Sequence, residues 1–217
     1  MMTNLFSVFD PATGIFSLNW LSMMLIFMMP TPYWNLPSKI ILLNIFVLKN
    51  LSNEIITHLK SSKPSIIFVT LFMFILINNI MGLFPYIFTA SAHLVFSLSM
   101  AASLWISLMM FGWINKTNSM FTHLVPIGTP SILMPFMVLI ESVSNLIRPG
   151  SLAVRLSANM IAGHLLMSLL GNNLINNMTM LFIMMWLFMG LMVFETAVAF
   201  IQSYVFMTLS TLYSSEI

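Results

Sequence analysis

The segment Ile66-Ile-Phe-Val-Thr-Leu-Phe-Met-Phe-Ile-Leu-Ile77 decides the fold of this chain. It belongs to a run from Pro64 to Asn115 that contains no Asp, Glu, Lys or Arg. Such a run can hold two membrane-spanning helices of about 20 residues each. Apolar and polar residues do not alternate in it, as they would in a strand of a transmembrane barrel. The run therefore predicts α-helices in a bilayer rather than a soluble core.

The composition of the whole chain agrees with a membrane protein. Of its 217 residues, 59% are hydrophobic and only 6% are charged, whereas about 25% are charged in an average soluble domain. The formal net charge is +2, and no basic cluster with interleaved aromatics occurs, so nucleic acid is not an expected partner. The chain has no cysteine, which excludes disulfides, thiolate metal sites and iron–sulfur clusters. We expect neither a metal nor a cofactor.

Apolar runs divide the chain into five expected crossings within one integral membrane domain, residues 1–217. The last two runs are far longer than the 30 Å hydrocarbon core requires. Their helices must therefore be strongly tilted, bent or broken, and Pro149-Gly150 is the expected bend in the first of them. The opening run is short and would cross with local thinning of the bilayer. The expected spans are 15–29, 66–84, 94–114, 131–170 and 178–213.

One further helix, over 38–60, is expected to be amphipathic and to lie at the membrane interface. It mixes lysines, asparagines and Glu54 with leucines and isoleucines, and its charge density disfavours a span. The fold class is therefore an all-α polytopic membrane protein with about five crossing helices and one interfacial helix. Lysines occur between the first and second spans and at Lys116, but not in 86–93 or 171–177. Basic loops mark one side of a membrane, so five crossings place the C-terminus with the lysines and the N-terminus opposite.

Arg155 is the charged residue that most needs an explanation. No other Asp, Glu, Lys or Arg occurs between it and Glu195. A guanidinium stays protonated in a protein, and at the centre of a membrane helix it costs about 2.5–3.5 kcal/mol on insertion scales. On a helix, the charged residues of 131–170 share one stripe within about 60° of Arg155, and the rest of that stripe is mostly small or hydroxylated. Its members are Glu141, Ser144, Arg148, Ser151, Ala158, Asn159 and Ala162.

Two interpretations of this stripe remain open from the residues alone. Small residues let another helix approach closely, so Arg155 is either presented to a closely apposed partner or paired with an acid of the same chain. Glu141 lies about 21 Å away along the helix, and Arg148, which is nearer to it, is its expected partner. Glu195 is the other candidate acid.

Three polar residues outside the stripe complete the candidate site. His164 falls on the face opposite Arg155, where it either packs through a hydrogen bond or carries protons. Glu195 and Gln202 are seven residues apart and share a face of the last helix. Glu195 either neutralises Arg155 or belongs to a proton relay, because ionisable groups inside a membrane mark ion or proton paths by default. The residues predict a membrane protein that handles protons.

Four blocks of sequence together resemble a known family. They are Asn4-Leu-Phe-Ser-Val-Phe-Asp10, Gly82-Leu-Phe-Pro-Tyr86, Glu141-x13-Arg155-Leu-x-Ala-Asn159-x4-His164 and Glu195-x-Ala-Val-Ala-x-Ile-Gln202-x-Tyr204-Val-Phe. On these blocks the chain resembles subunit a of the mitochondrial F-type ATP synthase over its whole length, and insect-like forms most of all. The resemblance implies a subunit that is not an enzyme on its own. Its implied partners are a ring of c subunits, peripheral-stalk and accessory subunits, protons and the lipid bilayer.

The resemblance also implies roles for the site residues. Two half-channels pass protons to and from carboxylates of the c-ring, and Arg155 separates them. His164 and Glu195 match the inlet positions, and Glu141 matches the outlet carboxylate on the matrix side. The expected location is the mitochondrial inner membrane, with the N-terminus in the intermembrane space and the C-terminus in the matrix. Polar residues that flank the arginine are matched by Asn159 and Gln202.

Two other functions are compatible with an apolar chain of this kind. A membrane subunit of a respiratory redox complex would usually pair histidines for haem, but the four histidines are scattered singly. A stand-alone proton-coupled transporter often shows two related halves, and no convincing repeat occurs. Both alternatives are therefore weaker than the proton-channel subunit.

Overall fold

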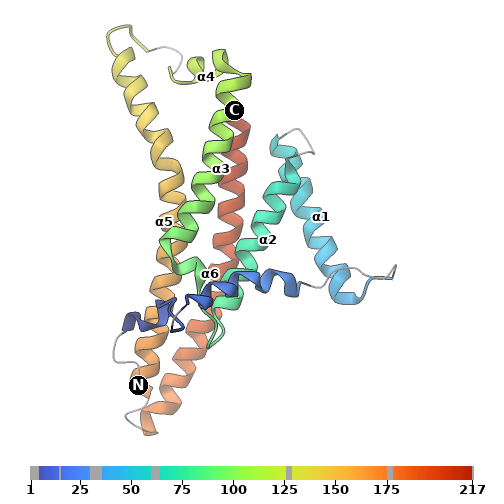
Figure 1. Cartoon of the computed structure of the whole chain (residues 1–217), viewed down its shortest axis with the longest axis vertical. Helices are drawn as coiled ribbons and strands as arrows, with labels where there is room; N and C mark the ends of the chain where they lie inside the picture. The colour runs from blue at the N-terminus through green and yellow to red at the C-terminus, as the bar shows by residue number, and fades with distance from the viewer. Residues whose placement is uncertain are drawn as a thin grey trace.

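The structure is a computed structural model that describes residues 5–14, 16–29, 36–59, 64–125, 129–174 and 178–216. Within these ranges every regular element is helical (Figure 1). Five of the helices are long and apolar enough to cross a membrane. The expectation of an all-α polytopic membrane protein is therefore confirmed. The elements are η1 (Leu5–Phe9), η2 (Leu18–Met28), α1 (Lys39–Leu59), α2 (Ser65–Gly82), η3 (Ala90–Ala92), α3 (Leu94–Asn115), α4 (Thr117–His123), α5 (Met134–Leu174) and α6 (Met178–Glu216).

Helices α5 and α6 are the longest elements, with 41 and 39 residues. At 1.5 Å per residue each is about 60 Å long, roughly twice the thickness of the hydrocarbon core. The two helices contact each other, but the start of α5 lies apart from the end of α6 (Figure 1). Helix α5 runs through Pro149 without interruption, although a proline removes one backbone donor. Each helix is therefore far longer than the hydrocarbon core requires, as the sequence predicts, and α5 is not broken at Pro149-Gly150.

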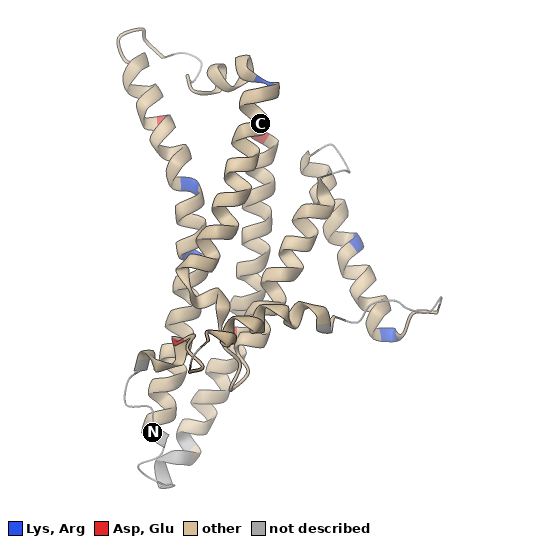
Figure 2. Ribbon diagram, in the orientation of Figure 1, with Lys and Arg blue, Asp and Glu red and all other residues tan. Residues whose placement is uncertain are grey.

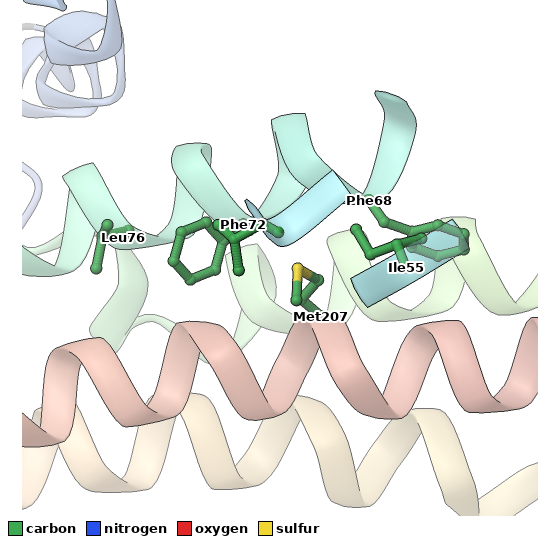
Figure 3. Packing of buried hydrophobic residues seen from close by; sticks show 6 residues of the cluster. Ile55, Phe68, Phe72, Leu76 and Met207 are labelled. Atoms are coloured by element: carbon green, nitrogen blue, oxygen red, sulfur yellow. The ribbon is translucent and has the colours of Figure 1, made fainter. Parts of the chain in front are cut away.

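The core joins the α5–α6 pair to the rest of the bundle. One cluster of buried side chains comes from α1, α2 and α6, including Ile55, Phe72 and Met207 (Figure 3). A second cluster joins α2, α3, α5 and α6. It contains Ile75, Ala101, Leu152, Ala153, Leu156 and Phe206. In a bilayer such contacts stabilise through close van der Waals packing rather than through removal from water, so they fix which face of α5 points inward.

The N-terminal third differs from the expected set of crossings. The predicted span 15–29 contains η2, a 3-10 helix of 11 residues, which is shorter than a membrane span requires. The predicted interfacial helix 38–60 forms as α1, but α1 packs against α2 and α6 and buries Leu51 and Ile55. Its length and hydropathy are those of a span. The count of five therefore holds with α1 in place of the first segment.

Candidate functional site

Arg155 lies on the outward face of α5. Its side chain is exposed, while Leu156 and Ser157 beside it are buried toward the bundle. Small residues of the predicted stripe, Ser151, Ala158 and Ala162, are exposed with it. All five Asp and Glu residues of the chain fall within the described ranges. No ion pair between any of them and Arg155 is present there. The interpretation of an internal partner is thus not supported, and the charge is presented outward.

A hydrogen bond ties α5 to α6 one turn from Arg155. The Asn159 side-chain amide donates to Oε1 of Gln202 at 3.1 Å. Gln202 is buried and Asn159 is half-buried. The sequence predicts both as site residues, and the structure brings them together. Their bond fixes the register of the two long helices beside the arginine.

Glu195 packs directly against the backbone of α5. It is only 5% exposed, and its carboxylate occupies the space that a Cβ at Gly163 would need. The next residue, His164, is half-buried. Oε2 of Glu195 and Nε2 of His164 are both buried without a hydrogen-bond partner among the described residues. Buried polar groups normally have a partner, which can be water. Glu195 therefore lies beside Gly163, the residue before His164, and both predicted inlet residues retain unused hydrogen-bonding capacity.

Glu141 belongs to a separate cluster at the other end of α5. Its Oε1 lies 3.6 Å from Nη2 of Arg148, which confirms the predicted pairing. Two further members are not evident from the sequence. Glu216 also pairs with Arg148, and the guanidinium lies over the Tyr213 ring at 5.2 Å from its centroid.

A cavity of about 290 Å³ opens at this second cluster. Helices α3, α4, α5 and α6 line it with Trp105, His123, Glu141, Arg148, Tyr213 and Glu216, among others. Its wall combines carboxylates, a guanidinium and aromatic rings. Figure 2 shows how sparse charged residues are on the helices and that α5 carries both signs.

The three parts of the site are ordered along one continuous helix. Along α5, Arg155 is nine residues from His164 and fourteen from Glu141, or about 14 Å and about 21 Å at 1.5 Å per residue. These residues are therefore not brought together. Arg155 lies instead between a polar pair toward one end and an ion-pair cluster with a cavity toward the other.

A group of buried polar residues lies around η3 and α2, and we do not predict it from the sequence. Asn79 on α2 and Thr89, Ser91 and His93 around η3 have buried side-chain atoms without hydrogen-bond partners among the described residues. Asn79 and Ser91 are fully buried. A signal existed, because two adjacent asparagines interrupt an otherwise apolar span at Asn78-Asn79. Intramembrane polar residues rarely lack a role or a partner.

These features define a class of protein: a polytopic membrane protein with an outward-facing unpaired arginine between two separated polar regions. No group of three or more His, Cys, Asp or Glu that could hold a metal occurs in the described part of the chain.

Comparison with known proteins specifies the class further. The family model of the ATP synthase A chain matches residues 15–215. The chain is 54% identical to ATP synthase subunit a of Anopheles gambiae and of Locusta migratoria, and 56% identical to that of Drosophila melanogaster, over the full length of both chains in each case. The chain belongs to the ATP synthase subunit a family.

Proposed function

We propose that this chain is the proton-translocating stator subunit of a rotary ATP synthase. It is not an enzyme alone, but it works beside a ring of c subunits within the complex. The observation that carries the proposal is the exposed Arg155 guanidinium, which has no carboxylate partner among the described residues. A fixed charge costs free energy in a membrane, so its retention is explained by a counter-charge from another subunit. Carboxylates of the c-ring are that counter-charge.

The small residues around Arg155 support close approach of the ring. Ser151, Ala158 and Ala162 are exposed on the same face, and small side chains let helices pack closely in membranes. A permanent ion pair at this site would stop rotation. Arg155 therefore meets each deprotonated carboxylate briefly and releases it. An arginine does not give up its proton at accessible pH, so it attracts the carboxylate without relaying a proton.

The two polar regions on either side serve as the half-channels. His164 and Glu195 form the inlet, where a proton passes to a ring carboxylate. The protonated carboxylate then rotates away from Arg155 through the bilayer. Glu141, beside the cavity, accepts the proton at the outlet. Asn159 and Gln202 keep α5 and α6 in register between the two paths. A membrane potential supplies about 2.3 kcal/mol per charge per 100 mV, and a proton that leaked directly past Arg155 would dissipate it.

The same proposal places the chain in the mitochondrial inner membrane. The start of α1 and the end of α6 lie at opposite ends of the bundle (Figure 1), which supports five crossings with the two termini on opposite sides. The N-terminus then lies in the intermembrane space and the C-terminus in the matrix. Peripheral-stalk and accessory subunits contact the chain outside the ring-facing surface.

The variant Arg155→Ala tests the proposal. We expect the complex to assemble and proton-driven ATP synthesis to be abolished, with Arg155→Lys unable to restore it because a lysine presents no planar fork. The matched control is Lys49→Ala, which removes an exposed positive charge from α1. Normal ATP synthesis in assembled Arg155→Ala complexes would overturn the proposal.

A further inference from the structure

The N-terminal segment lies across the polar side of the bundle. This segment, residues 5–29 apart from Ile15, contains η1 and η2 and runs across the long helices (Figure 1). Its element η1 contacts α5, and η2 contacts α2 and η3. These are the elements that carry His164, Asn79 and the polar residues around η3. The segment is named the N-terminal cover below.

Two aromatic rings of the N-terminal cover each lie on a histidine. Phe9 contacts His164 edge to face, with ring centroids 6.3 Å apart. Trp20 contacts His93 with centroids 5.2 Å apart, and Phe88 packs on both of these rings. Nε2 of each histidine is buried without a protein hydrogen-bond partner in the described part of the chain. Both rings therefore cover an imidazole that still has a polar atom to satisfy.

Local hydrogen bonds brace the cover between its two rings. Oδ1 of Asp10 accepts from the Ala12 amide at 3.0 Å, and the Asn19 side chain donates to the Asp10 carbonyl at 3.3 Å. Oγ1 of Thr13 donates to the Phe16 carbonyl at 2.6 Å and accepts from the Leu18 amide at 3.2 Å. Such side chain–backbone bonds favour one turn geometry over others. Phe9 and Trp20 are thus held at a fixed separation.

We propose that the N-terminal cover controls which solutes reach the polar inlet, with Phe9 closing over His164 and Trp20 over His93. A buried polar nitrogen without a protein partner is satisfied by water, so water and protons reach the histidines past the rings. Larger hydrated ions and reagents are kept out by the rings. Phe9 and Trp20 are then selectivity and positioning residues. The inference rests on the proposed function only in taking His164 as part of the proton path.

Cysteine labelling tests the cover directly, because the chain has no cysteine of its own. The assembled complex that carries His164→Cys is placed in oriented proteoliposomes and treated with a membrane-impermeant cationic methanethiosulfonate reagent. Ala12→Cys, at an exposed position, gives the labelling rate for free access. We expect slow labelling of His164→Cys. Adding Phe9→Ala should raise its rate several-fold, because it removes the ring that lies over position 164.

The matched control and a second site keep the outcome interpretable. Phe6 is 68% exposed in the same helix η1, so Phe6→Ala should leave the labelling of His164→Cys unchanged. The same logic applies to His93→Cys, with Trp20→Ala as the opening variant and Phe16→Ala, which removes a 70% exposed ring, as its control. If the His164→Cys complex fails to assemble, the labelling of His93→Cys with and without Trp20→Ala still tests the cover.

Two results would overturn the cover. One is labelling of both cysteines as fast as Ala12→Cys with the rings intact, and the other is labelling that neither Phe9→Ala nor Trp20→Ala accelerates. The labelling requires no proton transport, so it remains informative whatever the activity of Arg155→Ala. Active Arg155→Ala complexes with ring-dependent labelling would refute the proposed function and leave the cover standing. Inactive Arg155→Ala complexes with labelling that does not depend on the rings would refute only the cover.

Discussion

Gly163 on α5 provides the space in which the Glu195 carboxylate lies. A Cβ at this position would overlap the carboxylate carbon and both of its oxygens. Those atoms are the far end of a flexible side chain, whereas the α5 backbone is fixed by packing of Leu156 and Met160 into the bundle. The variant Gly163→Ala therefore moves the carboxylate rather than the helix.

The expected magnitude follows from two opposing effects. Alanine in a helix interior is about 0.5–1 kcal/mol more favourable than glycine, so α5 and the assembly of the complex should not suffer. Restoring ordinary contact at Gly163 requires the Glu195 carboxylate to move by about 1 Å, and a 1 Å misplacement of a reacting group can cost about 100-fold in rate. We expect proton-driven ATP synthesis to fall by about 10- to 100-fold.

The assay compares ATP synthesis in proteoliposomes with the amount of assembled complex on a native gel. The control is Gly171→Ala on the same helix, where a Cβ would meet nothing within 4 Å, and its rate should match the unmodified complex. Full activity of Gly163→Ala would show that the position of Glu195 against α5 is unimportant. Loss of assembly in Gly163→Ala alone would show that the backbone, rather than the carboxylate, gives way.

Two further predictions concern the ties between α5 and α6. Asn159→Ala and Gln202→Ala should each lower the resistance of the protein to unfolding in detergent. A double-mutant cycle on that unfolding should give a coupling free energy of about 0.6 kcal/mol, the average for interhelical hydrogen bonds in membranes. Strict additivity of the two variants would show that the 3.1 Å hydrogen bond does not form in the complex. Arg148→Gln leaves Glu141 and Glu216 without their cation, and because this pairing is partly exposed, the cost in stability should be at most about 1 kcal/mol. Proton release should nevertheless slow by a few-fold in Arg148→Gln, measured as the rate of ATP synthesis at limiting proton-motive force. The rate of Arg148→Lys should be intermediate. An unchanged rate in Arg148→Gln would show that Arg148 has no role in the outlet.

The helices that the sequence predicts best are those whose pattern is strongest. The spans 66–84, 94–114, 131–170 and 178–213 differ from α2, α3, α5 and α6 by no more than about four residues at any end, within the usual uncertainty of sequence-based boundaries. Long apolar runs leave no other structure in a bilayer. Segment 15–29 and helix α1 were harder, because short or mixed runs have similar hydropathy whether they span, lie at the interface or pack on a neighbour.

Some contacts of the candidate site follow from the sequence and others do not. Helical periodicity was sufficient to place Arg155 on a face of small residues and to pair Glu141 with Arg148, because those relations lie within one helix. Contacts between helices, such as Asn159 with Gln202 or Arg148 with Glu216, depend on how two helices are aligned, and a single sequence does not specify that alignment. The ring contact between Phe9 and His164 joins residues 155 positions apart, and no local pattern predicts it.

The surroundings of Arg155 in the assembled complex test the central claim most directly. An experimental density map of the complex, sorted by rotary state, would show which carboxylate lies within ion-pair distance of the guanidinium. We predict a carboxylate of a c subunit there in at least one state, and neither Glu141 nor Glu195 in any state. An Arg155 that stays paired with Glu195 throughout the rotary cycle would contradict the account.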